Sequence, residues 1–353
     1  MRLRQENTRN ITKHNIKTDK MLYKNTFHTE NLSQYTFLVT GGAGFIGSNI
    51  VEYLLNYNAG KVKVLDNFST GLRQNIDDFI NKPNFEIIED DITNINACRK
   101  ACEDVDYVIH QAALGSVPRS IKDPITTNLN NVNGFLNMLI AAREAKVKRF
   151  VYASSSSVYG DSNILPKKEE YTGKPLSPYA VSKITNELYA NVFYKNYGIE
   201  VIGLRYFNVF GPRQNPKGPY AAVIPLFFEK ILKNLPPQID GDGEQTRDFT
   251  FIENAVQANI KAIFCKNKNA VGNVFNIAFG SATSINKLFE MICSIANKQI
   301  KAEHRAARLG DIRQSLADIN KACEILDYKP LIDVKEGLKI SFEWYKNNIL
   351  NFN

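Results

Sequence analysis

The feature that most constrains the fold is a glycine-rich turn between a short apolar run and a helical pattern. Residues 36–39 predict a buried strand, Gly41, Gly44 and Gly47 follow it, and a helix is expected over 45–57. A turn without side chains lets the backbone approach a pyrophosphate, and the helix N-terminus adds free N–H groups and a positive dipole end. A glycine turn can serve packing alone, but this position between strand and helix predicts a dinucleotide site.

Strand and helix patterns alternate from residue 35 to about residue 212. Five more apolar runs predict strands at 61–65, 85–88, 106–109, 149–152 and 200–204, and helical patterns cover 94–102, 124–145 and 179–197. Such alternation is typical of a doubly wound, mostly parallel sheet. We therefore expect a Rossmann-type α/β fold, with a flexible extension over 1–32, a dinucleotide-binding domain over 33–212 that later segments complete, and a smaller α/β substrate-binding cap over 213–353.

The charge and hydropathy patterns argue against nucleic-acid and membrane partners. Residues 1–30 hold seven basic and three acidic side chains and so carry half of the net charge of +8. The remaining charge is too dilute to form a basic groove. No segment approaches the ~18 consecutive apolar residues that would span a bilayer. The first 30 residues also lack the apolar core of a signal peptide.

The five cysteines are scattered and odd in number, which favours reduced thiols in a cytoplasmic protein over a disulfide framework. Cys98 and Cys102 lie four residues apart on a predicted helix, but the other ligands that a zinc site needs are missing. We therefore expect buried structural thiols and no metal centre.

An acidic residue indicates which dinucleotide is bound. The second predicted strand leads into Asp66, where a carboxylate can accept hydrogen bonds from the hydroxyls of an adenosine ribose. No arginine follows directly to hold a 2′-phosphate. The sequence therefore favours NAD over its 2′-phosphorylated form.

Tyr179 and Lys183 stand four residues apart near the start of a predicted helix, directly after Pro178. This spacing places both side chains on one face of the helix. A phenol with an ordinary pKa of about 10 is a poor base at neutral pH, but a neighbouring ammonium and a cationic nicotinamide would lower that pKa. A Tyr-x-x-x-Lys pair is common by chance. Here it follows a serine-rich strand end at 154–157, and this combination favours catalysis.

These motifs together resemble the extended short-chain dehydrogenase/reductase family, and the resemblance extends over most of residues 35–345. The pattern Gly41-x-x-Gly44-x-x-Gly47 is the one that this family uses. The resemblance implies an NAD site made by Gly41, Gly44, Phe45, Ile46, Gly47, Asp66, Asn67, Ser69, Thr70, Gly71, Asp91, Ile92, Gln111, Ala112, Ala113, Asn131, Tyr179, Lys183 and Tyr206.

The residues at the serine-rich strand end indicate the reaction. The resemblance assigns Ser155, with Ser156 as a partner, to hydrogen-bond the reacting sugar hydroxyl beside Tyr179 and Lys183. Sugar-nucleotide dehydratases of the family carry an Asp-Glu pair here and the decarboxylases a Glu, where this chain has Ser156 and Ser157. Without these acids we expect oxidation and reduction rather than elimination. An epimerase needs only that, with tightly bound NAD regenerated in each cycle.

Further segments match the family's contacts to a nucleotide-sugar. Besides the two serines, the resemblance assigns substrate binding to Asn208, Ala222, Val223, Arg247, Arg308 and Asp311. The two arginines would hold the diphosphate, because a guanidinium can pair two of its oxygens at once.

Three small residues indicate which sugar is bound. Ser315 stands where epimerases restricted to glucose and galactose nucleotides typically have a tyrosine. Gly115 and Ser116 belong to a segment, 113–120, that resembles bacterial UDP-N-acetylglucosamine 4-epimerases of surface-polysaccharide synthesis. Small side chains would leave room for an N-acetyl group. We therefore expect 4-epimerisation of UDP-N-acetylglucosamine and UDP-N-acetylgalactosamine.

Other functions stay open at this point. An epimerase of UDP-glucose or UDP-glucuronate has the same motifs. A 4-keto-sugar nucleotide reductase would consume NADPH, against which Asp66 argues, and a non-catalytic dinucleotide sensor would not need Tyr179 and Lys183. The family resemblance also implies a homodimer formed through the helices at about 124–145 and 179–197.

Overall fold

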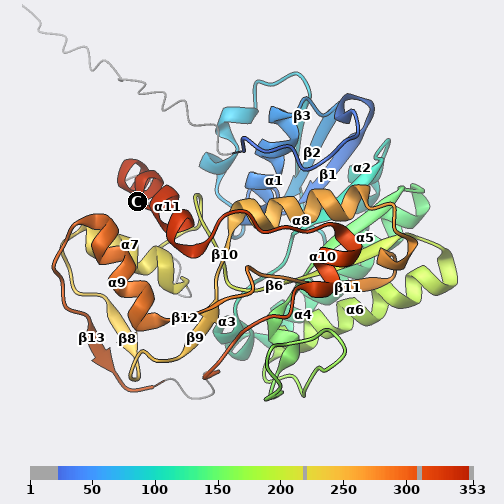
Figure 1. Ribbon diagram of the computed structural model, residues 1–353. Helices are drawn as coiled ribbons and strands as arrows, with labels where there is room; N and C mark the ends of the chain where they lie inside the picture. The colour runs from blue at the N-terminus through green and yellow to red at the C-terminus, as the bar shows by residue number, and fades with distance from the viewer. Residues whose placement is uncertain (1–22, 218–220, 308–311, 350–353) are drawn as a thin grey trace, which may run out of the picture.

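The centre of the molecule is a parallel sheet (Figure 1). Within residues 23–217, 221–307 and 312–349, which the computed structural model describes, seven strands form this sheet in the order β3-β2-β1-β4-β5-β6-β11. Their bounds are β1 Thr36–Thr40, β2 Lys61–Asp66, β3 Phe85–Glu89, β4 Tyr107–His110, β5 Arg149–Ser155, β6 Val201–Tyr206 and β11 Asn273–Ile277. All neighbours run parallel, and the order reverses beside β1, so the doubly wound α/β class is confirmed.

Helices cover both faces of the sheet. Helices α1 (Phe45–Asn56) and α8 (Ile252–Phe264) pack together on one face, and α2 (Ile95–Cys102), α5 (Gly134–Glu144) and α6 (Pro178–Tyr197) lie on the other. Successive side chains of a strand point to opposite faces. Phe37 and Val39 of β1 accordingly belong to the apolar cluster under α1 and α8, whereas Leu38 belongs to the cluster under α2 and α5.

A smaller lobe packs beside the sheet and appears in yellow to red in Figure 1. Its elements are α7 (Val223–Leu232), α9 (Ile285–Ala296), α11 (Val334–Asn348) and the short strands β8 (Gln238–Asp240), β9 (Thr246–Asp248), β12 (Ala282–Ser284) and β13 (Glu303–Arg305). The strands β7 (Val209–Phe210) and β10 (Thr250–Phe251) pair between lobe and sheet, and α10 (Asn320–Leu326) contacts β11. The chain therefore enters the lobe after β6, returns to the sheet with α8 and β11, and enters the lobe again.

The segment before β1 differs from the flexible extension that we expected over 1–32. Its described part, 23–32, packs on α1: the Tyr23 side chain is fully buried and its hydroxyl donates to Asn49 at 2.6 Å. The Phe27 ring stacks on Tyr53, with ring centroids 5.4 Å apart. Aromatic side chains supply enough apolar area to fix an irregular segment, and their irregular spacing gives no helix or strand pattern. Residues 23–32 are thus docked, although we expected them to belong to a flexible extension.

The expected helix over 124–145 is divided. Helices α3 (Val117–Lys122) and α4 (Pro124–Asn128) precede a π-helical turn at Leu129–Asn133, and α5 follows. A π-turn widens the helix by one residue and is frequent at functional sites. It carries Asn131, whose buried amide hydrogen-bonds both the N–H and the carbonyl of Leu114. The turn thereby fixes the loop after β4.

No helix within the described residues is long and apolar enough to cross a membrane.

Candidate active site

A cleft of about 470 Å³ opens at the carboxyl ends of the strands, the position where open α/β sheets bind ligands. Its lining brings together most residues that the sequence assigned to NAD: Gly41, Gly44, Phe45, Ile46, Gly47, Asp66, Asn67, Ser69, Thr70, Gly71, Ile92, Gln111, Ala112, Ala113, Tyr179, Lys183 and Tyr206. The two others, Asp91 and Asn131, stand behind the lining and hold it. Asp91 accepts a 2.6 Å hydrogen bond from Asn67, and Asn131 holds Leu114.

The turn after β1 has no room for side chains. At Gly41, where φ is +67°, a Cβ would lie 2.7 Å from the Ala112 nitrogen, and at Gly47 it would lie 2.1 Å from the Gly41 carbonyl oxygen. Gly44 caps α1 without any side-chain hydrogen bond. The helix N-terminus therefore keeps its N–H groups for another acceptor. This cradle fits the pyrophosphate of a dinucleotide.

Asp66 ends β2 and lines the cleft. Its two carboxylate oxygens accept hydrogen bonds from the N–H groups of Ala43 and Phe68, each at 2.9 Å. Burial raises the pKa of Asp66, and the two N–H donors oppose that rise. Because a carboxylate has about four acceptor positions, the fixed side chain keeps capacity for ribose hydroxyls. This donor set fits NAD.

Three catalytic candidates meet across β5 and α6. Ser177 caps α6 by accepting from Ala180, and Pro178 starts the helix, which places Tyr179 in its first turn and Lys183 one turn later. Ser155 at the end of β5 hydrogen-bonds Tyr179. The Lys183 ammonium donates to the Ala153 carbonyl at 2.8 Å. The phenol thus has a hydroxyl partner on one side and a fixed cation nearby.

Burial decides the pKa values of this pair. It lowers the pKa of Lys183 to about 8, while the Glu187 carboxylate opposes the decrease. It raises the pKa of Tyr179, against the hydrogen bond from Ser155. We expected a lowered phenol pKa. Desolvation of the phenolate outweighs the Ser155 hydrogen bond, so activation of Tyr179 depends on positive charge brought close to its hydroxyl.

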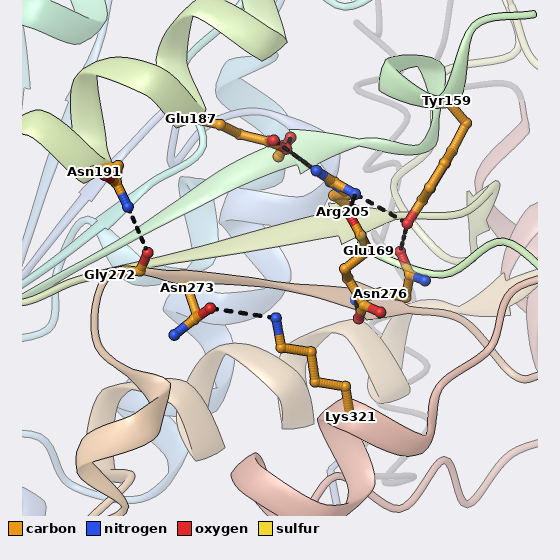
Figure 2. Close-up of polar contacts among 10 residues, drawn as sticks. Tyr159, Glu169, Glu187, Asn191, Arg205, Gly272, Asn273, Asn276 and Lys321 are labelled. Carbon is orange, nitrogen blue, oxygen red and sulfur yellow. Dashed lines mark hydrogen bonds and ion pairs between the residues drawn. The ribbon is translucent and has the colours of Figure 1, made fainter. Parts of the chain in front are cut away.

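A buried polar network lies beneath these residues (Figure 2). Glu187 of α6 accepts from both Nε and Nη2 of Arg205 on β6, at 2.9 and 2.8 Å, and from the Ser154 hydroxyl. The Arg205 guanidinium also donates to Tyr159, which donates in turn to Asn276 on β11. The network joins β5, α6, β6 and β11 directly behind the catalytic candidates.

The candidates for substrate binding are less completely assembled. Gly115 and Asn208 line the cleft together with Ser155, and the Asn208 amide donates to the Asp248 carbonyl. Six others lie off the lining. Ser116 caps α3, Ser156 opens a 3₁₀ turn, Ala222 and Val223 form the start of α7, and Arg247 and Ser315 belong to the smaller lobe.

The predicted phosphate and sugar contacts gather on adjacent segments of the smaller lobe. Arg247 of β9 donates to the Ile312 carbonyl, and the Arg313 carbonyl accepts from Thr246 beside it. Ser315 is buried on that neighbouring segment, away from the cleft lining. Arg308 and Asp311 lie outside the described residues.

Eight lining residues were not predicted: Leu65, Asp90, Leu114, Asn130, Ala153, Ser154, Val209 and Gln214. All but Ala153 and Gln214 are adjacent in sequence to predicted residues, so widening each motif by one position would have found those six. Gln214 lies in a loop without a recognisable pattern and reaches the cleft only through the fold.

The chain matches known proteins over most of its length. The model of the NAD dependent epimerase/dehydratase family matches residues 37–278. A putative UDP-glucose 4-epimerase of Methanocaldococcus jannaschii is 42% identical over 313 residues, which cover 88% of this chain and 98% of that protein.

Two solved structures show the same fold with ligands bound. UDP-N-acetylglucosamine 4-epimerase from Methanobrevibacter ruminantium, in complex with UDP-N-acetylmuramic acid, is 40% identical with a TM-score of 0.84, covering 89% of this chain and 99% of that one. UDP-glucuronic acid 4-epimerase from Bacillus cereus, in complex with UDP-glucuronic acid and NAD, is 34% identical with a TM-score of 0.82, covering 88% and 99%.

Proposed function

Because this chain belongs to the NAD-dependent epimerase/dehydratase family and is an NAD-dependent UDP-sugar 4-epimerase, we propose that it interconverts UDP-N-acetylglucosamine and UDP-N-acetylgalactosamine. In this proposal Tyr179 accepts the proton of the sugar 4-hydroxyl, which Ser155 hydrogen-bonds. Bound NAD takes the hydride from C4 and returns it to the opposite face of the 4-keto sugar. Lys183 stabilises the phenolate, and the reverse proton transfer restores the enzyme.

The observation that carries the choice of sugar is the free space at Gly115. A Cβ at this position would meet nothing within 4 Å, and its φ lies outside the left-handed region. The fold therefore does not require glycine here, in contrast to Gly41 and Gly47. Gly115 lines the same cleft as Ser155, so the missing side chain enlarges the ligand space. That space supports an N-acetyl substituent, and the likeness to the Methanobrevibacter ruminantium enzyme supports it as well.

A second candidate is epimerisation of UDP-glucose or UDP-glucuronate. The names of the Methanocaldococcus jannaschii and Bacillus cereus relatives favour these sugars at comparable identity. Ser315 lies off the cleft lining. It can make room for the N-acetyl group of UDP-N-acetylglucosamine only if its segment turns toward the sugar when substrate binds. We assign nucleotide and sugar contacts, including Arg247, Arg308 and Asp311, to the lobe formed mainly by residues 213–353, beside an NAD-binding domain over 33–212.

We also propose a homodimer. Exposed apolar side chains recur at one-turn spacing on α3 and α4, at Val117, Ile121 and Ile125. On α6 they recur at spacings of two turns and one turn, at Val181, Leu188 and Val192. Ile125 is 72% exposed and Leu188 63%. Contiguous exposed apolar faces mark interaction sites. The Leu188→Glu variant should be monomeric by light scattering, whereas a dimer of unchanged mass would refute this face.

The deciding experiment incubates purified protein with UDP-N-acetylglucosamine, without added cofactor, and follows the sugar by NMR. Appearance of UDP-N-acetylgalactosamine supports the proposal and shows that NAD is retained. No product from this substrate, even with NAD supplied, refutes the acetamido assignment. Parallel reactions with UDP-glucose and UDP-glucuronate then identify the second candidate.

A further inference from the structure

The hydroxyl of Tyr206 lies between two amide side chains. Tyr206 ends β6 and lines the cleft together with Tyr179 and Lys183. Its oxygen lies 3.1 Å from Nε2 of Gln111 and 2.7 Å from Nδ2 of Asn259, which belongs to α8 and is fully buried. Asn259 belongs to none of the cofactor or substrate contacts that the sequence motifs predict.

The orientation of both amides is fixed by one backbone contact. Nδ2 of Asn259 donates to the Ala255 carbonyl one turn earlier, at 2.8 Å. The opposite orientation of this amide would place its Oδ1 against the Ala255 carbonyl oxygen, and two acceptors cannot hydrogen-bond each other. Oδ1 of Asn259 then accepts from Nε2 of Gln111 at 3.2 Å, which fixes Gln111 as well. Each NH₂ group has its second hydrogen left, and both of these hydrogens are donated to the Tyr206 oxygen.

The Tyr206 oxygen therefore accepts two hydrogen bonds, and its own proton must be donated elsewhere. A phenol oxygen has one hydrogen and acceptor capacity for two donors. Among the described residues no hydrogen bond takes up this proton. Burial raises the pKa of Tyr206 to about 12, so the hydroxyl keeps the proton over the whole physiological range. The free direction is the cleft that Tyr206 lines.

We propose that Asn259 is a positioning residue which, with Gln111, directs the Tyr206 hydroxyl proton into the cleft as a donor to an acceptor oxygen of bound NAD. Removing either the hydroxyl or the residue that orients it should release NAD faster. This inference depends on NAD binding and not on the identity of the sugar. It can therefore fail while the proposed substrate is correct, and the reverse also holds.

The test measures the rate at which NAD dissociates from the full-length holoenzyme, in the absence of any sugar nucleotide. Tyr206→Phe removes the donor, and Asn259→Leu removes the orienting amide at similar volume. Each should accelerate NAD loss by about tenfold, the effect of one net hydrogen bond. The double variant should lose NAD no faster than Tyr206→Phe alone, because Asn259 acts through the hydroxyl.

Asn254→Leu is the matched control. Asn254 is also a buried amide on α8, but it hydrogen-bonds the backbone of residues 331 and 332, away from the cleft. Its replacement should lower stability and leave NAD dissociation unchanged. Equal acceleration by Asn254→Leu, or an additive effect of Asn259→Leu in the Tyr206→Phe background, would overturn the proposal.

Asn259→Asp keeps the test valid if the leucine variant does not fold. An ionised carboxylate at this position accepts hydrogen bonds only, so it would draw the Tyr206 proton away from the cleft. NAD loss from this variant should accelerate as the pH rises and the carboxyl ionises. The NAD dissociation rate of wild-type protein, measured over the same range of pH 6 to 9, is the reference. If the rate of Asn259→Asp rises with pH no more than the wild-type rate does, the proposed direction of the Tyr206 proton is wrong.

Discussion

The cofactor side of the cleft and its substrate side differ in how completely the protein itself holds the polar groups. On the cofactor side, Asp66, Asn131 and Tyr206 are buried and each makes at least two hydrogen bonds within the chain. On the substrate side, Gly115 borders open space and the Arg247 guanidinium is turned to backbone carbonyls. The catalytic candidates are therefore held by the sheet and α6, whereas in our proposal selection among sugars depends on loops, namely the loop after β4 that carries Gly115 and the loops of the smaller lobe.

The largest expected effect is the loss of turnover in Tyr179→Phe, which removes the only proton acceptor that we assign to the reaction. A positioned acid–base group contributes roughly 10²- to 10⁴-fold to rate, so kcat should fall by at least about 100-fold. NAD content and thermal midpoint should change much less than kcat, because the other residues of the predicted NAD site are retained and phenylalanine keeps the ring of Tyr179. An activity within tenfold of wild type in the NMR assay would show that another group takes the proton.

The second effect concerns the buried pair behind the catalytic candidates. The side chains of Arg205 and Glu187 are only 4% and 13% exposed, so Glu187→Gln leaves a cation without its charge partner in a desolvated site. Such a change costs about 3–5 kcal/mol of unfolding free energy. The surface pair Arg73–Glu89, with side chains 60% and 55% exposed, is the control, and Glu89→Gln should cost no more than about 1 kcal/mol. Equal losses in denaturant titrations would mean that the buried network does not stabilise the cofactor side.

The same contrast explains how much could be predicted from the sequence. The turn at Gly41, the acid at Asp66 and the spacing of Tyr179 and Lys183 are local patterns, and the fold brings all four to one cleft. Six strands are apolar runs, whereas β11 is interrupted by Asn276, whose side chain turns into the buried network. It was not predicted because its polar residue finds partners only in three dimensions.

Residues that act only through the fold had no signal in the sequence. Asn259 stands on a helix without a motif, and its partner Gln111 is 148 positions away. Tyr23 and Phe27 anchor the N-terminal segment through Asn49 and Tyr53, contacts that no periodic pattern reveals. The predicted phosphate ligand Arg247 donates to the carbonyl of Ile312, 65 positions away, a contact that no local pattern indicates.

A smaller effect is expected on substrate preference when the open space beside Gly115 is filled. Gly115→Leu should lower kcat/KM for UDP-N-acetylglucosamine relative to UDP-glucose by about 10- to 200-fold, the range over which a pocket discriminates small apolar groups. Gly115→Ala should fold normally and change the ratio less, because its Cβ meets no protein atom within 4 Å. Comparing both substrates for both variants distinguishes steric exclusion from general damage, since the latter would reduce both rates in parallel.

The smallest effect arises at Asp248, which joins the substrate lobe to the sheet. Its buried carboxylate accepts hydrogen bonds from the N–H groups of Phe279, Gly280 and Ala317. Burial nevertheless raises the pKa of Asp248 to about 6, with these donors opposing the rise. An unfolded aspartate ionises near 4. Between the two values the folded protein binds more protons than the unfolded chain, so the stabilisation is complete at low pH and is lost as the pH rises through about 6.

From pH 5 to pH 7 this group should therefore lower the free energy of unfolding by about 1 kcal/mol. Asp248→Asn cannot ionise and should lose that part of the pH slope in denaturant titrations, even if its stability is lower throughout. If Asp248→Asn keeps the wild-type slope, the carboxylate is ionised in the folded state at pH 5. The hydrogen bonds to Asp248 would then hold the substrate lobe as firmly as the cofactor side is held. The cofactor side and the substrate side would differ only in the open space beside Gly115.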